Sequence, residues 1–439
     1  MRPVGFVSYI RFVYHQGLSS RLAPSYRPAT MQPLLRRDFL ASSLGAIAAF
    51  SSVSSALGEI RVDHGPHFAS SLFLTWFTDP TTTMVVQWIG PASSPNFISY
   101  SAMHEPTWRV ASVATKPFPD SNLLVHRCEL RGLTPGGEYR FALGTHPRSY
   151  RFRTMPAKAN DTITFVSGGD SGVDQPAINT NKLAAKQDPR FAFIGGDLAY
   201  DNGTSPYTFL KFLQNYSQHM IDREGRMIPL LSCVGNHETR GGKRSMHDAA
   251  PSYLSVFDGL FSETSYGVLD IGDYLSLVLL DTGHLMPVKG EQTRWLAKTL
   301  ADRQDRPHLI VANHVPAYPS YRTYESTGGD NRKYWCPLFE RFNVDVVLEH
   351  HDHTYKRTHP LKDGRPDRYG VPYLGDGSWG KLRSLQKPEE RPYLAAYDSA
   401  YHVSVHRLEG DQRFHIALED SGKVADVCMT ASKRPAKRG

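Results

Sequence analysis

Five short polar segments, each placed directly after an apolar run, constrain the fold of this chain more than any other feature. The apolar runs are residues 163–166, 191–194, 228–231, 309–311 and 344–348, and helix-like stretches separate them. Short apolar runs of this kind are typical of buried strands in a largely parallel sheet. Because open α/β sheets place their sites beyond the carboxyl ends of the strands, we expect the polar segments to meet at one edge.

The polar segments hold side chains that a cluster of metal ions would need together. In chain order they are Gly169-Asp170-Ser171-Gly172, Gly196-Asp197-Leu198-Ala199-Tyr200, Gly235-Asn236-His237-Glu238, Val311-Ala312-Asn313-His314 and His350-His351-Asp352-His353. They supply two carboxylates, a phenol, a carboxamide and three imidazoles as candidate ligands, with His237 left over. This inventory fits two metal ions that share one bridging carboxylate. Glycine before Asp170, Asp197 and Asn236 is expected to let the backbone turn sharply at each strand end.

The order GDxG, GDxxY, GNH[DE], VxxH and HxH resembles the metallophosphoesterase superfamily. Tyr200, three residues after Asp197, narrows the resemblance to the purple acid phosphatases, and the match covers about residues 160–410. The resemblance implies two metal sites that share Asp197, with Asp170, Tyr200 and His353 at one and Asn236, His314 and His351 at the other. One departure is His350, where the family usually has glycine.

Ligand hardness indicates the type of each metal ion. Carboxylate and phenolate favour a hard trivalent ion, whereas an Asn oxygen with two imidazoles suits a divalent ion. The resemblance therefore implies Fe(III) paired with Fe(II), Zn(II) or Mn(II). Two neighbouring cations lower the pKa of a bound water and clamp phosphate oxygens, so the expected reaction is attack of a metal-bound hydroxide on a phosphomonoester.

Side chains beside the ligands are candidates for proton transfer and substrate binding. His237 is the best placed proton donor, and Glu238 is expected to orient its imidazole. Plant members of the family carry a histidine pair shortly after the VxxH ligand, but residues 318–324 contain no histidine. Arg322 or a tyrosine is expected to replace that pair. The predicted substrate contacts are Asn236, His237, Arg322 and Tyr324.

Each residue also has a plainer explanation when it is taken alone. Asp170 or Asp197 could cap a helix after a strand, Asn236 and His237 could belong to a turn, and Glu238 could be a solvated loop carboxylate. Separate explanations of this kind do not account for the occurrence of all five motifs in one chain, so the metal site is favoured. A phosphodiesterase or nucleotide pyrophosphatase on the same metal site stays open as the alternative function, and a binding protein with a vestigial site is a third reading.

A different pattern precedes the first ligand segment. Seven short β-like runs between Phe73 and Thr154, separated by turn residues, predict a β-sandwich. The stretch Leu133–Phe141 resembles the L-x-P-x-x-x-Y corner of fibronectin type III domains, and a similar domain precedes the catalytic one in plant-type purple acid phosphatases. The expected fold is α/β, with a fibronectin III-like sandwich at residues 65–156 and a metallophosphoesterase domain of two mixed sheets flanked by helices at residues 160–420.

The N-terminal residues 1–57 read as a signal region. Arg36-Arg37-Asp38-Phe39-Leu40, followed by Ser- and Ala-rich residues and a small-residue end at Ser54-Ser55-Ala56, resembles a twin-arginine export signal over residues 31–57. The apolar stretch is too short for a membrane span. We therefore expect a bacterial protein that the twin-arginine machinery exports to the periplasm or beyond. An uncleaved hydrophobic anchor is the alternative.

The formal net charge of +7 comes from the two ends of the chain. Six arginines against Asp38 give residues 1–57 a charge of +5, and residues 421–439 carry +4, which leaves −2 for residues 58–420. A nearly neutral body predicts no nucleic-acid-binding face. The basic residues 421–439 predict a disordered, solvated tail.

Overall fold

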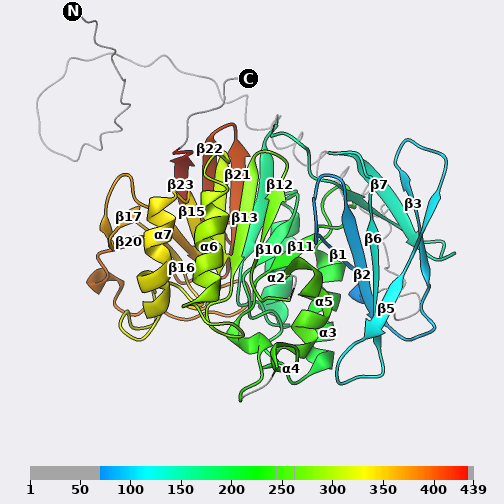
Figure 1. Cartoon of the computed structure of the whole chain (residues 1–439), viewed down its shortest axis with the longest axis horizontal. Coiled ribbons are helices and arrows are strands. Elements are labelled where there is room, and N and C mark those ends of the chain that lie inside the picture. The colour runs from blue at the N-terminus through cyan, green and yellow to red at the C-terminus, as the bar shows by residue number, and fades with distance from the viewer. Residues whose placement is uncertain (1–69, 160, 243–244, 262, 434–439) are drawn as a thin grey trace, which may run out of the picture. The chain divides into compact units, whose positions relative to one another are not determined.

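The computed structural model describes residues 70–433, apart from residues 160, 243–244 and 262. The predicted signal region and the six C-terminal residues lie outside this description. The rest of the chain contains a β-sandwich followed by a larger α/β domain, as the sequence predicts (Figure 1).

The sandwich consists of two antiparallel four-stranded sheets. One has the strand order β1 (Phe73–Thr75), β2 (Met84–Gly90), β6 (Leu124–Leu130), β5 (Ala114–Pro117); the other has the order β4 (Arg109–Ser112), β3 (Phe97–Ala102), β7 (Glu138–Leu143), β8 (Ser149–Arg153). The buried rings of Phe141 and Phe152 lie in the core. The backbone N–H of Thr134 donates to the phenol oxygen of Tyr139 at 2.8 Å, which is the contact expected of the predicted corner.

The α/β domain is built on a six-stranded and a seven-stranded mixed sheet. The first has the order β11 (Leu230–Ser232), β10 (Ala192–Ile194), β9 (Ile163–Gly168), β21 (His402–Glu409), β22 (Gln412–Glu419), β23 (Val424–Ala431). The second has the order β12 (Gly267–Ile271), β13 (Leu275–Leu280), β14 (His308–Asn313), β15 (Val346–Glu349), β19 (Tyr373–Asp376), β16 (Tyr355–Thr358), β20 (Leu394–Asp398). A small hairpin, β17 (Leu361–Lys362) and β18 (Arg365–Pro366), lies outside both sheets.

The described helices separate the ligand-bearing strands along the chain. They are α2 (Gln175–Ala185), α3 (Pro206–His219), α4 (Met246–Ala249), α5 (Pro251–Phe261), α6 (Glu291–Ala301) and α7 (Cys336–Arg341), with short turns of other helix types at η2 (Asn236–Glu238), η3 (Asn331–Trp335) and η4 (Pro388–Glu390). The side chain of Ser205 caps α3 by accepting from the backbone N–H of Thr208. Within residues 70–433 as described, none of these helices has the length and apolar character needed to cross a membrane.

The seven-stranded sheet is covered on both faces, which explains its nearly continuous apolar strands. Successive residues of a strand point to opposite faces of the sheet. In β14, Ile310 and Ala312 belong to the core shared with the six-stranded sheet, whereas Leu309 and Val311 belong to a second core with Leu296 of α6. A strand buried on both faces loses the alternation of polar and apolar residues. The parallel strands predicted from the apolar runs are confirmed by the pairing of β10 with β9 and β11 and of β14 with β15.

The C-terminal segment corrects one expectation. The basic composition of residues 421–439 predicts a disordered tail, but Val424–Ala431 forms β23 and pairs antiparallel with β22. The Asp426 carboxylate accepts hydrogen bonds from the Tyr355 hydroxyl at 2.7 Å and from Arg357 Nε at 2.5 Å, both on β16. The net charge of residues 421–439 does not reflect this strand, because four of the five basic residues lie after Ala431.

We expect Asp426→Asn to lower the free energy of unfolding by about 1.5–3 kcal/mol at pH 7, the usual scale for hydrogen bonds to a charged group. Burial alone would raise the pKa of Asp426, but the bonds from Arg357 and Tyr355 hold it below its usual value. The stabilisation should therefore be present above the pKa of an unfolded aspartate and should be lost as the pH falls through the folded-state pKa. Urea unfolding of both proteins between pH 7 and pH 3 measures this.

The exposed Asp420→Asn is the matched control, since Asp420 lies on the turn before β23. It should unfold at the same urea concentration as the wild type. Equal stability of Asp426→Asn and wild type at pH 7 would mean that β23 is not anchored to β16.

Candidate metal centre

The polar segments converge because each follows the carboxyl end of a strand. Asp170 lies two residues beyond β9, Asp197 three beyond β10 and Asn236 four beyond β11. From the second sheet, His314 directly follows β14 and His351 follows β15. Strands β9, β10 and β11 are mutually parallel, as are β13, β14, β15 and β19. The ligand-bearing ends therefore point to the same edge of the paired sheets.

One group of donors consists of Asp170, Tyr200 and His353. The Tyr200 hydroxyl lies 3.0 Å from Asp170 Oδ1 and 2.8 Å from His353 Nε2. His353 Nε2 lies 3.0 Å from the same Asp170 oxygen. The other oxygen, Oδ2, accepts from the backbone N–H of His351 at 2.7 Å. Three donor atoms therefore face one point, as the ligands of a single ion would.

A second group consists of Asn236, His314 and His351. His314 Nε2 lies 3.1 Å from Asn236 Oδ1 and 3.0 Å from His351 Nδ1. The other ring nitrogen of His314 contacts the backbone oxygen of Gly195 at 2.8 Å, which fixes the orientation of the ring. Both groups predicted from the family resemblance are thus brought together, each with its three side chains.

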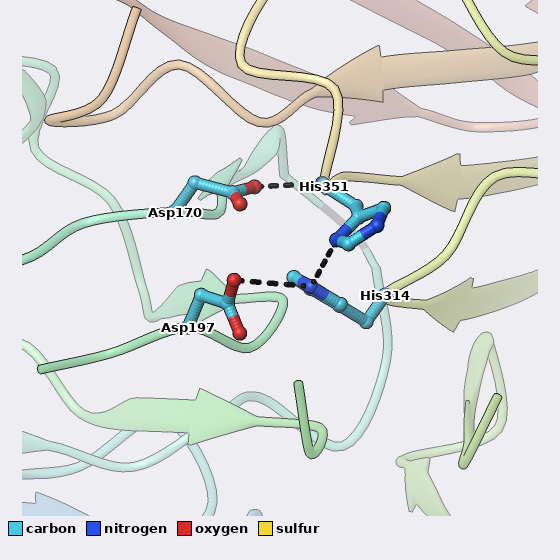
Figure 2. A group of neighbouring side chains, drawn as sticks. All are labelled: Asp170, Asp197, His314 and His351. Carbon is cyan, nitrogen blue, oxygen red and sulfur yellow. Dashed lines mark hydrogen bonds and ion pairs between the residues drawn. The ribbon is translucent and has the colours of Figure 1, made fainter. Parts of the chain in front are cut away.

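Asp197 lies between the two groups. Donor atoms of Asp170, Asp197, His314 and His351 all fall within 4.8 Å of one another (Figure 2). Asp197 Oδ1 accepts from the backbone N–H of His237 at 2.8 Å, and Oδ2 lies 3.3 Å from His314 Nε2. Among the residues that the structure describes, no well-formed hydrogen bond reaches buried Oδ2, which faces the imidazole nitrogens of His314 and, at 3.9 Å, His237. A buried carboxylate oxygen that faces other candidate ligands is suited to binding cations, so the donor set fits two metal ions.

Charges at the centre are compensated within the cluster. Burial would raise the pKa of Asp197, but His314 and His237 hold it below its usual range. Burial likewise disfavours a charged His314, yet the facing Asp197 raises the pKa of this imidazole to about 9. A cation that binds here must displace the His314 proton. Metal affinity should therefore depend on pH.

The backbone at this edge adopts a conformation that few non-glycine residues take. Five of the predicted ligands have φ values between 54° and 70°, in the left-handed region: Asp170, Asp197, Tyr200, His351 and His353. Backbone strain of this kind persists only where the surrounding structure enforces it, and it is common at functional sites. The ligands themselves therefore make the sharp turns at the strand ends.

The expectation that the preceding glycines make these turns is wrong for two of the three. Gly196 does have a positive φ of 86°, but Gly169 and Gly235 do not. Their role is close approach. A Cβ on Gly169 would lie 2.7 Å from the His350 ring, and one on Gly235 would lie 2.4 Å from Asp197 Oδ1. His350, the departure from the family pattern, is a buried side chain whose ring fills the space that Gly169 leaves open.

Glu238 has a different role from the one predicted. Its carboxylate accepts three backbone hydrogen bonds of 2.7 Å, from Asp197, Leu198 and Gly235. Burial, reinforced by the nearby Asp197, raises the pKa of Glu238 to about 8. It therefore holds two ligand-bearing loops against each other instead of orienting the His237 imidazole.

The group that orients His237 is Asn202, which the sequence reasoning missed. His237 Nδ1 and Asn202 Oδ1 lie 2.5 Å apart. Because an amide oxygen only accepts, this contact places a proton on Nδ1 and leaves Nε2 for the site, 3.9 Å from Asp197 Oδ2. The His237 ring lies 4.2 Å from the Tyr200 ring. The available signal was the position of Asn202, two residues after Tyr200.

The two remaining predicted contacts differ in their surroundings. Arg322 Nη1 donates to the backbone oxygen of ligand His351 and to Asp352 Oδ1, so the guanidinium reaches the second donor group. Tyr324 instead packs on Tyr393, and the guanidinium of Arg332 lies 3.7 Å over its ring. These contacts give Tyr324 a packing role and do not support the predicted phosphate contact.

Two family models match the chain. Residues 70–154 match the model described as purple acid phosphatase, N-terminal domain, and residues 151–355 match the calcineurin-like phosphoesterase model. The boundary between the matches falls at β8 and just before β9. Two packed mixed sheets with this donor cluster at their edge define a metal-dependent phosphoric ester hydrolase.

Individual relatives agree with these matches. Purple acid phosphatase 21 of Arabidopsis thaliana is 26% identical over 326 residues, which cover 71% of this chain and 72% of that protein. A Mycobacterium tuberculosis protein, named only as uncharacterised, is 27% identical over 352 residues, which cover 70% of this chain and 63% of that protein. A purple acid phosphatase from yellow lupin (Lupinus luteus) seeds shares the fold, with a TM-score of 0.69 at 18% identity over 82% of this chain and 74% of that one.

The chain belongs to the purple acid phosphatase family of calcineurin-like phosphoesterases. Members of this family use a dinuclear metal centre, and the donor cluster around Asp197 is the candidate for that centre here.

Proposed function

We propose that this protein is an exported phosphatase that hydrolyses phosphomonoesters. The observation that carries the proposal is the pair of donor groups joined by Asp197, in which donor atoms of Asp170, Asp197, His314 and His351 lie within 4.8 Å of one another. Asp170, Tyr200 and His353 would hold one ion, and Asn236, His314 and His351 the other. When bound, two such ions clamp phosphate oxygens and generate the nucleophile from water.

The donor chemistry supports a mixed-valence or mixed-metal pair. The Tyr200 phenol and the Asp170 carboxylate favour Fe(III), while the Asn236 amide and the imidazoles of His314 and His351 suit Fe(II), Zn(II) or Mn(II). This assignment agrees with the partition of the donors into two groups in the structure.

The side chains outside the two donor groups would handle the proton and the substrate. In its imidazolium form His237 would deliver the Nε2 proton to the leaving oxygen, while the Nδ1 proton stays hydrogen-bonded to the Asn202 amide oxygen, 2.5 Å from Nδ1, and fixes the ring. Arg322 would contact a phosphate oxygen beside His351. Residues 318–324 contain no histidine, so Arg322 would supply the positive charge at that end of the site.

The experiment that tests the reaction class compares p-nitrophenyl phosphate with bis-p-nitrophenyl phosphate on metal-loaded protein. We expect kcat/KM for the monoester to exceed that for the diester by at least about tenfold, equivalent to about 1.4 kcal/mol in transition-state binding. A preference for the diester would favour the phosphodiesterase alternative, which uses the same ligands. Hydrolysis of neither substrate by protein with a full metal content would refute the proposal.

We expect His237→Gln to lower kcat for the monoester about 100- to 10,000-fold, the usual range for losing a general acid, while metal content stays unchanged. Asn202→Ala should show a smaller loss in the same direction, because the ring keeps its proton but loses its orientation. Steady-state kinetics with elemental analysis measures both variants. An unaltered kcat in His237→Gln would remove His237 from the mechanism.

Tyr200→Phe is the complementary variant for the same experiment. If Tyr200 is a phenolate ligand of Fe(III), wild type and His237→Gln should share a visible charge-transfer band, and only Tyr200→Phe should lose it. A band that persists in Tyr200→Phe would show that another group binds the iron.

Export is proposed from Arg36 and Arg37 in the predicted signal region. Replacing both arginines with lysine keeps the charge but removes the residue type that the twin-arginine pathway reads. We expect the doubly substituted protein to stay in the cytoplasm of a bacterial host, whereas the wild type appears in the periplasm, as judged by cell fractionation and immunoblotting. Equal distribution of the two proteins would contradict this route.

A further inference from the structure

A lysine that the motif comparison does not single out lies beside the first donor group. Lys381 follows β19 in the loop that crosses back over the ligand segments. Its ammonium lies 4.8 Å from the centre of the Tyr200 ring, and its stem lies against Gly172, where a Cβ would meet Lys381 Cε at 2.8 Å. Arg322 lies at the other donor group, where it donates to the backbone oxygen of His351.

The position of Lys381 is fixed relative to the metal centre. Its backbone N–H donates to the backbone oxygen of Asp170 at 3.0 Å, and that of Gly380 donates to the same oxygen at 3.1 Å. The buried ring of Trp379 anchors the loop, with Nε1 donating to Asn181 Oδ1 at 2.8 Å. Because the loop is tied to ligand Asp170 itself, the backbone of Lys381 is held beside the donor group, and its side chain reaches the Tyr200 ring.

The present partner of Lys381 is a weak one. Lys381 Nζ pairs with Asp174 Oδ2 at 3.0 Å, but the Asp174 side chain is 63% exposed and that of Lys381 is 28% exposed. Exposed pairs of this kind contribute little to stability, about 0–1 kcal/mol. An anion that brings its own charge to this place can therefore replace Asp174 at small cost.

We propose that Lys381 determines substrate specificity by binding a second anionic group, a carboxylate or a phosphate, on the leaving group of the phosphoester. This proposal rests on the phosphomonoesterase function proposed above. The phosphoryl group that is transferred would lie on the shared Asp197 centre with Arg322 at one end. Lys381 Nζ lies 4.8 Å from the centre of the Tyr200 ring, and the same ring lies 4.2 Å from His237, the proposed proton donor to the leaving oxygen, so the leaving group is the part of a substrate nearest to Lys381.

The test compares phenyl phosphate with 3-carboxyphenyl phosphate, which differ by one carboxylate on the leaving group. In Lys381→Met, the ratio of kcat/KM for 3-carboxyphenyl phosphate over phenyl phosphate should fall about tenfold relative to wild type, equivalent to about 1.4 kcal/mol of binding. Lys381→Arg should keep most of the ratio, because it keeps the charge. Asp174→Asn should raise the ratio two- to threefold, because it removes the competing carboxylate.

Lys387→Met is the matched control. Lys387 lies on the same loop and pairs with Glu390 at 2.8 Å, with both side chains mostly exposed. It should leave the ratio and the activity on both substrates unchanged. If Lys381→Met does not fold, Asp174→Asn still tests the proposal, because it should raise the kcat/KM ratio that Lys381→Met should lower.

A ratio that is the same in wild type, Lys381→Met and Asp174→Asn would overturn the role of Lys381 while leaving the phosphatase function intact. A fall of the same ratio in Lys387→Met would also overturn it, because the effect would then belong to the general charge of the loop. If the metal-loaded wild type hydrolyses neither substrate, the proposed function fails, and this inference fails with it.

Discussion

The position of Asp197 is the constraint on which the rest of the site depends. Its carboxylate lies between two donor groups, each of which combines residues from both sheets, and its backbone N–H donates to Glu238 at 2.7 Å. Glu238 in turn accepts from Gly235, so the loops after β10 and β11 are held by one buried carboxylate. A shift of this unit would move the Asp197 carboxylate, the Asn236 amide and His237 together.

Two buried, charged carboxylates as close as Asp170 and Asp197 repel each other unless a positive charge compensates them. The pKa of His314 is raised and that of Asp197 is lowered, so a protonated His314 supplies part of this positive charge. The left-handed backbone of five ligands adds strain, and the packed cores on both faces of the seven-stranded sheet hold it in place. A rigid scaffold of this kind keeps the donors oriented without relying on the metal ions to organise them.

The sequence predicted much of this arrangement for a physical reason. Parallel strands end at a common edge, so residues such as Asp170 and His314 can be assigned to one place from apolar runs alone, although 143 positions separate them in the chain. The roles of Glu238 and Asn202 could not be assigned in this way. Each depends on which backbone or side-chain atom lies within hydrogen-bond distance across a loop, and sequence spacing does not carry that information.

The sequence by itself determined the parts: a sandwich followed by an α/β domain, the ligand segments, and the family to which they belong. These follow from local periodicity and from motifs in a fixed order. The tertiary structure decided which groups meet. Only the folded chain shows that Glu238 joins two loops and that Asn202 contacts the His237 ring. It also shows that Tyr324 packs in an aromatic group and that residues 424–431 form an edge strand. These contacts between distant segments depend on packing in three dimensions.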